Sequence, residues 1–97
     1  MAQVEYQYEG IITTIQYQED QKMSEIFNSF TFKANISENE INYSYNGRVL
    51  SKNDKDLTFE QIANKMDKER KKMNILVISQ DNNINDNILI IKKKYIN

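Results

Sequence analysis

Residues 41–51 read INYSYNGRVLS, and this stretch decides the fold. Apolar and polar residues alternate over 41–45, which is the period of a half-buried β-strand. Asn46 and Gly47 then form a dipeptide typical of a tight hairpin turn, because both residue types tolerate a positive φ. Apolar residues resume at 49–50, so we expect a short strand that pairs back on the first.

The segments before this stretch predict another hairpin, followed by a helix. Residues 4–9 and 11–18 alternate in the same way and are separated by Gly10, which favours two antiparallel strands. The apolar spacing then changes to that of an amphipathic helix, which we predict over 22–34. Asp20 precedes this helix and is the candidate cap for its first turn.

The segments after the stretch predict a loop, a short helix and a last strand. Residues 51–56 are polar and loop-like. Thr58 and Gln61 have the spacing of a capping box, which starts a short helix. The charged run 67–72 favours a solvated loop or the frayed end of that helix. Residues 74–79 contain an unbroken aliphatic run, which is typical of a central strand.

Composition limits the classes of function. The chain has 97 residues, of which 39% are hydrophobic and 28% charged, as expected for one domain with one core. There is no Cys and no His, which excludes disulfides, thiolate nucleophiles, His bases and ordinary zinc sites. The net charge of −1 does not favour nucleic acid or anionic membrane as a partner. Without a secretory signal or an apolar run of membrane-spanning length, we expect an intracellular protein.

The order strand, strand, helix, strand, short strand, short helix, strand is the β-grasp arrangement. The residues resemble the ubiquitin-like family over 4–79, and four pieces carry the resemblance. These pieces are the hairpin 4–17, the apolar stripe 23–30, YNGRVL at 45–50, and LTFEQIA at 57–63 before MNILVIS at 73–79. The resemblance implies an α+β fold in which one main helix crosses one face of a mixed sheet. The domain would span 1–79, with 80–97 a polar linker and a short apolar, basic tail.

The resemblance also implies recognition rather than catalysis, because family members present the solvent-exposed face of the sheet to helical or zinc-containing partners. In ubiquitin this face carries an aliphatic patch, whose positions correspond here to the turn Glu9-Gly10, Ser44 and Ile78. Ser44 departs from the family pattern, since it is small and polar where ubiquitin has an apolar residue. Leu76 lies two residues before Ile78 and is expected on the same face.

Arg48 stands where ubiquitin has a lysine used to link chains, and arginine cannot form that isopeptide bond. Conjugable members end in Gly-Gly after the last strand, whereas no glycine follows Gly47 here. The resemblance therefore implies a non-conjugating domain of a larger protein. The predicted partner-binding residues share positions on or beside the outer sheet face: Ser44, Arg48, Leu76 and Ile78.

We therefore expect a ubiquitin-like protein-interaction module that is monomeric, needs no cofactor and is not an enzyme. No catalytic residue, metal ligand or cofactor is predicted, and the partner is another protein. Two alternatives stay open. The domain could be structural or autoinhibitory and pack on its own chain, or it could bind nucleic acid weakly through the lysines of 92–94.

Three other patterns are better explained by structure than by function. Tyrosines on the apolar phase of the strands could stack on nucleic-acid bases, but they suit a core better. The cations of 68–72 are interleaved with acids, which favours a solvated segment. Asp81, Asn83 and Asn85 imitate the start of a calcium loop, yet Asp86 stands where that loop needs glycine.

Overall fold

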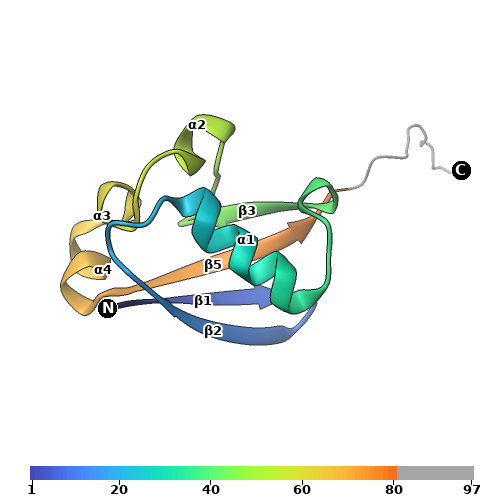
Figure 1. Ribbon diagram of the computed structural model, residues 1–97, viewed down its shortest axis with the longest axis horizontal. Coiled ribbons are helices and arrows are strands. Elements are labelled where there is room, and N and C mark those ends of the chain that lie inside the picture. Colours follow the sequence, from blue (N-terminus) through green and yellow to red (C-terminus); the bar gives the residue numbers. More distant parts are fainter. Residues whose placement is uncertain (81–97) are drawn as a thin grey trace, which may run out of the picture.

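The computed structural model describes residues 1–80, in which a five-stranded mixed sheet carries one long helix across one face (Figure 1). The strands are β1 (Ala2–Tyr8), β2 (Ile11–Tyr17), β3 (Ile41–Tyr45), β4 (Arg48–Val49) and β5 (Lys72–Ser79). The helices are α1 (Met23–Ala34), the 3₁₀ turn η1 (Glu38–Glu40), α2 (Lys52–Lys55), α3 (Phe59–Ile62) and α4 (Lys65–Arg70). The predicted α+β architecture is confirmed.

The strand order is β2-β1-β5-β3-β4, so the last strand of the described chain lies at the centre of the sheet. β5 runs parallel to β1 and antiparallel to β3. Its buried residues alternate with exposed ones, so the unbroken aliphatic run at 75–78 supplies side chains to both faces of the sheet. The prediction of a central strand is confirmed.

Aromatic stacking joins α1 to the inner face of the sheet. The ring of Phe27 stacks on Tyr43 with centroids 3.8 Å apart, and Phe30 stacks on Tyr6 at 4.3 Å. Such pairs contribute about 0.5–1.5 kcal/mol each beyond the area that they bury. The buried Tyr6 hydroxyl lies 3.1 Å from the Ile26 carbonyl oxygen, so its polar end is satisfied. The tyrosines of the strands therefore build the core, as predicted.

The turns and caps follow the local sequence closely in two places. Asn46 and Gly47 have φ values of 52° and 80°, which is the left-handed geometry expected of their hairpin. In the predicted capping box, the Gln61 backbone N–H donates to Thr58 Oγ1 at 3.2 Å, and the Thr58 N–H donates to Gln61 Oε1 at 3.0 Å.

The predicted cap of α1 is wrong. Lys22 occupies the N-cap position and makes no side-chain capping hydrogen bond, and Asp20 is exposed. The helix start is held by tertiary structure instead, since the Met23 N–H donates to the Leu57 carbonyl oxygen at 2.8 Å. A contact between segments this far apart in the chain has no local signal.

The prediction of a loop over 51–56 is also wrong, because α2 forms there. Ser51 and Asp54 make a capping box, in which the Asp54 N–H donates to Ser51 Oγ at 3.2 Å. Aspartate takes the place that glutamate or glutamine usually has in this motif. The short side chain still reaches back, and the Ser51 N–H donates to its Oδ2 at 2.8 Å.

The charged run forms α4 and not a solvated loop. Asn64 caps this helix by accepting the Asp67 N–H on Oδ1 at 2.8 Å, and Lys71 ends it in the left-handed conformation. Asp67 is buried, and Tyr45 donates its hydroxyl proton to Asp67 Oδ2 at 2.5 Å. Arg70 also contacts this carboxylate, at 3.0 Å. A long-range hydrogen bond to β3 thus stabilises a helix that has little apolar pattern of its own.

Gln80, the first residue of the predicted linker, is hydrogen-bonded to the domain. The Gln80 N–H donates to the Glu40 carbonyl oxygen at 2.7 Å, and its side-chain Nε2 donates to the Ile41 carbonyl oxygen at 3.0 Å. The rest of the predicted linker and tail, 81–97, lies outside the described residues. Among residues 1–80, no helix has the length and apolar character needed to cross a bilayer.

Replacing Tyr45 with Phe should destabilise the domain by about 1–3 kcal/mol, because the buried Asp67 carboxylate and the Asn64 N–H would each lose a hydrogen bond. Urea unfolding of the full chain measures this. Tyr8→Phe is the matched control, because the Tyr8 hydroxyl makes only a long 3.5 Å contact with the Ser79 hydroxyl at an exposed position. Equal effects of the two substitutions would contradict the assigned role of Tyr45.

The buried tyrosines predict loss of stability at alkaline pH. Burial raises the pKa of Tyr6 and Tyr43 far above the ordinary value of 10.0, and the hydrogen bond to Glu38 raises that of Tyr43 further. Above pH 10 the unfolded chain releases these protons while the folded chain retains them, so unfolding becomes more favourable as pH rises. Each tyrosine should remove up to about 1.4 kcal/mol per pH unit.

Urea titrations between neutral pH and pH 11, followed by circular dichroism and phenolate absorbance, test this dependence. Phenolate absorbance from the buried tyrosines should appear together with loss of the folded spectrum. Ionisation of all six tyrosines with the folded spectrum intact would contradict the prediction.

Candidate functional site

The face of the sheet that points away from α1 is the candidate functional site. The strand register places five residues in one row across all five strands, and these side chains share this outer face. In strand order the row is Ile12, Gln7, Leu76, Ser44 and Val49. Ile78 pairs with Asn42 and lies on the same face, one step further along β5.

Aliphatic side chains gather on this face although it is not covered. Ile12, Val49, Leu76 and Ile78 are between 40% and 60% exposed, and we call them the outer-face patch. An antiparallel or mixed sheet with one solvated face usually carries polar residues there. Apolar side chains that collect on such a face instead are typical of an interaction surface.

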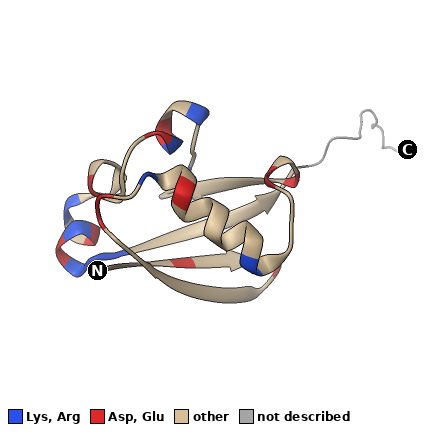
Figure 2. Ribbon diagram, in the orientation of Figure 1, with Lys and Arg blue, Asp and Glu red and all other residues tan. Residues whose placement is uncertain are grey.

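Charged residues leave most of this face free. Figure 2 shows Lys, Arg, Asp and Glu mainly on the helices and loops, with few on the strands. On the outer face Glu5 and Lys72 lie close together, with 3.4 Å between the carboxylate and Nζ. They neutralise each other, so the outer-face patch carries no strong field of one sign.

Ser44 lies between Leu76 and Val49 in the row but is only 8% exposed. Beside it is a hollow of about 330 Å³ whose lining combines amide side chains with one leucine. The lining residues are Glu5, Gln7, Ser44, Asn46, Gly47, Asn74, Ile75 and Leu76. Amide donors and acceptors next to Leu76 suit a polypeptide, which also presents amides beside apolar side chains.

Arg48 lies at the edge of the sheet rather than in the row. It pairs with Tyr45, whose side chain is buried on the inner face, whereas Val49 pairs with Ser44. The Arg48 guanidinium contacts Asp54 Oδ2 at 2.7 Å. Hydrogen bonds from the Ser51 backbone, and then this guanidinium, hold the pKa of Asp54 below its usual value.

The structure thus brings Ser44, Leu76 and Ile78 together on one face as predicted. Arg48 was predicted on the same face, but it pairs with the inward-facing Tyr45 at the sheet edge and contacts Asp54 instead. The sequence interpretation missed Ile12 and Val49. The Asn46-Gly47 turn fixes how the two strands of this hairpin pair. Counting paired positions from Ser44 across the turn would therefore have placed Val49 on the same face. Ile12 had a weaker signal, since its neighbour Ile11 is also apolar and hides which of the two faces outward.

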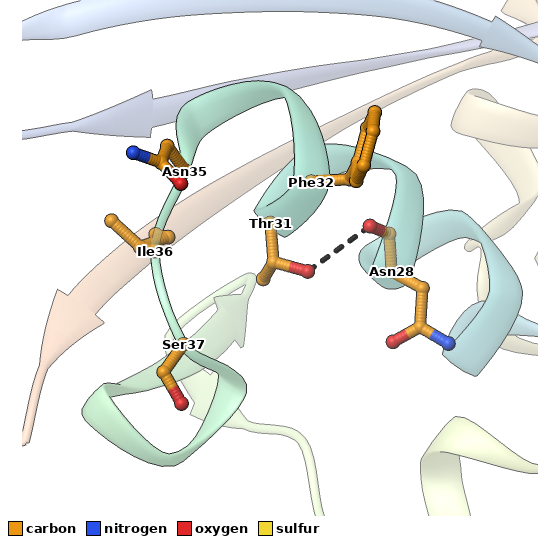
Figure 3. Close-up of a pocket in the computed structure, with 6 residues that line it drawn as sticks. All are labelled: Asn28, Thr31, Phe32, Asn35, Ile36 and Ser37. Atoms are coloured by element: carbon orange, nitrogen blue, oxygen red, sulfur yellow. Dashed lines mark hydrogen bonds between the residues drawn. The ribbon is translucent and has the colours of Figure 1, made fainter.

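A second hollow, of about 740 Å³, lies at the end of α1 (Figure 3). The Thr31 hydroxyl in its lining is satisfied within the helix, because Thr31 Oγ1 donates to the Asn28 carbonyl oxygen at 3.0 Å. Figure 3 shows the Phe32 ring pointing away from Ile36, and no charged side chain lines this hollow. This hollow therefore has no group that could act as an acid, base or nucleophile of a catalytic site. Within residues 1–80 as a whole, no cluster of acidic residues could hold a metal ion.

Comparisons with known proteins match the fold and not the sequence. No protein-family profile and no curated protein sequence matches this chain. Among solved structures, the UBL domain of yeast Ddi1 matches with a TM-score of 0.67 and 15% identity, over 86% of this chain and 93% of that one.

Two further solved structures have the same arrangement. ATBAG1, solved in complex with HSP70, matches with a TM-score of 0.63 and 14% identity, over 82% of this chain and 41% of that one. A protein designed on the basis of ubiquitin matches with a TM-score of 0.61 and 14% identity, over 84% of this chain and 92% of that one. Together with the strand order β2-β1-β5-β3-β4, these likenesses show that the chain adopts the ubiquitin-like β-grasp fold.

Proposed function

We propose that this domain is a protein-interaction module of the ubiquitin-like type, belongs to a larger intracellular protein and is not conjugated to other proteins. The outer-face patch carries this proposal. The residues that we expect to contact the partner are Ser44, Arg48, Leu76 and Ile78, together with Ile12 and Val49.

The arrangement of this face is that of a small protein interface. Leu76 and Ile78 are neighbours on the central strand and form its apolar centre. Glu5 and Lys72 lie on the same face beside this centre, and Arg48 lies at the sheet edge; charges at the rim of a protein interface favour correct orientation and fast association. A partner that covers the centre would remove aliphatic surface from water without burying an unpaired charge.

The composition of the face supports a protein partner over nucleic acid. Four of the five strand tyrosines that could have stacked on bases are buried and Tyr8 is half-buried, so the strands of the described sheet expose no row of aromatic rings. The pair Glu5–Lys72 leaves no run of cations there to follow a phosphate backbone. As a precedent for protein recognition, ATBAG1 was solved in complex with HSP70.

Replacing Leu76 and Ile78 with Ser should abolish partner capture while the melting curve stays cooperative. Truncating residues at the centre of an interface costs about 2 kcal/mol or more, which is at least about a 30-fold loss of affinity. A photo-cross-linking amino acid at Val49 identifies the bound protein in cell extract, and titration of that purified protein gives the affinity of each variant.

Met66→Ser is the matched control, because Met66 is an exposed apolar residue on α4, away from the sheet face. This variant should bind as the unchanged chain does. Full affinity of the Leu76→Ser, Ile78→Ser variant for the cross-linked protein would show that the outer face is not the binding surface.

Substitutions in β4 distinguish the centre of the face from its rim. Val49→Ser should weaken binding at every salt concentration, since it removes apolar contact. Arg48→Ala should change mainly the association rate, and this effect should fade as salt screens the rim charge. Stopped-flow binding at low and high salt measures both effects. A salt-independent loss of affinity with Arg48→Ala would place Arg48 in the centre of the interface instead.

A further inference from the structure

One edge of the sheet is long and carries no charge. β2 is the outermost strand on that side, and its seven residues read IITTIQY. Natural sheets protect such edges with charged residues, proline, bulges or very short strands. β2 has none of these, since its register with β1 is unbroken from Ile11 to Tyr17 and Figure 2 shows no charged residue along it.

The opposite edge of the described sheet is protected. β4 has two residues, and the Arg48 guanidinium at this edge contacts Asp54 Oδ2 at 2.7 Å. The chain then enters α2 at Lys52, so a further strand would find little extended backbone to pair with there. Within residues 1–80, the β2 edge is therefore the place where the sheet can accept another strand.

The tight turn at 9–10 sets which backbone groups of β2 point outward. In a two-residue hairpin the residues that flank the turn exchange both hydrogen bonds, and every second pair along the ladder does the same. Ile12, Thr14 and Gln16 belong to the alternate pairs, so their N–H and C=O groups point away from β1. All three residues are exposed, and no backbone hydrogen bond from another segment of 1–80 reaches them.

We propose that two copies of this chain pair through their β2 edges, in antiparallel direction, and form one continuous sheet. The register centred on Thr14 pairs all of the free groups, because Thr14 then faces Thr14 of the second copy and Ile12 faces Gln16. Each pair exchanges two backbone hydrogen bonds. Because both copies use the same edge and the other edge is protected, assembly closes at a dimer.

The side chains at this edge fit the pairing. Threonine opposite threonine is a favourable cross-strand pair, and no charge within β2 meets a like charge in the second copy. On the inner side, Ile15 of one copy lies opposite Thr13 of the other, where Thr13 lines a hollow of about 340 Å³ between β2 and the end of α1. Beyond the strand ends Glu9 approaches Glu19 of the second copy, whose charge Lys71 offsets at 3.4 Å.

The dimer is weak, because only one strand of each copy takes part and the contact is smaller than a standard protein interface. We expect a dissociation constant between about 10 μM and 1 mM. The monomer expected from the sequence is thus the form at low concentration. The two-fold axis is perpendicular to the sheet, so both outer faces lie on the same side of the dimer and stay uncovered. Pairing itself does not depend on the proposed function.

Sedimentation velocity of the full chain over about 10 μM to 1 mM measures the association. The mass should rise with concentration toward that of a dimer and no further. Thr14→Pro should weaken the dimer at least about tenfold while the melting curve stays cooperative, because the Thr14 N–H points off the sheet and only the second copy uses it. A chain that stays monomeric over the whole range would overturn the proposal, as would a folded Thr14→Pro chain that dimerises unchanged.

Cross-linking tests the register with a substitution that any strand tolerates. The sequence has no Cys, so Thr14→Cys gives one thiol per chain. Its counterpart in the second copy lies about 5.5 Å away between Cα atoms, so a short bis-maleimide should join the two chains. Gln16→Cys is the matched control on the same edge and face, because its own counterpart lies about 14 Å away along the strand. Gln16→Cys should react only when mixed with Ile12→Cys, and equal cross-linking of Thr14→Cys and Gln16→Cys alone would overturn the proposal.

The Leu76→Ser, Ile78→Ser variant separates edge pairing from association through the outer face. Both residues lie on the central strand, away from the β2 edge, so this variant should dimerise as the unchanged chain does. Loss of the dimer would place the contact on the outer-face patch and overturn edge pairing. The measurement uses the chain alone, so its result is independent of whether the outer face captures a partner protein.

Discussion

The stacking of two phenylalanines of α1 on two tyrosines of the sheet is the interaction on which the rest of this structure depends. Phe27 on Tyr43 and Phe30 on Tyr6 connect the helix to β3 and β1, which lie on either side of the central strand β5. With a single long helix available, one face of the sheet is buried and the other stays open. The position of the candidate binding surface follows from this one-sided packing.

Because a strand sends successive side chains to opposite faces, β5 serves the core and the surface at once. Ile75 and Val77 are buried under α1, while Leu76 and Ile78 lie on the outer face. A substitution in one set therefore tests stability, and a substitution in the other tests recognition. This separation is what allows a domain of this size to carry an aliphatic surface without weakening its core.

The two proposed contacts use different parts of the molecule and different physical properties. The outer-face patch is bounded by a neutral pair of charges, which suits a partner with an apolar centre. Pairing at the β2 edge uses backbone hydrogen bonds and leaves this patch accessible, since a paired strand lies beside the sheet and not over its face.

The sequence by itself determined the strands, the main helix and the hairpin at Asn46-Gly47, because alternation and turn chemistry are local properties. It also determined that Leu76 and Ile78 share a face. Only the tertiary structure decided that the charged run forms α4, since the hydrogen bond from Tyr45 to Asp67 joins residues that are 22 positions apart. Strand register, likewise a property of paired segments and not of one segment, decided which side chains complete the outer face.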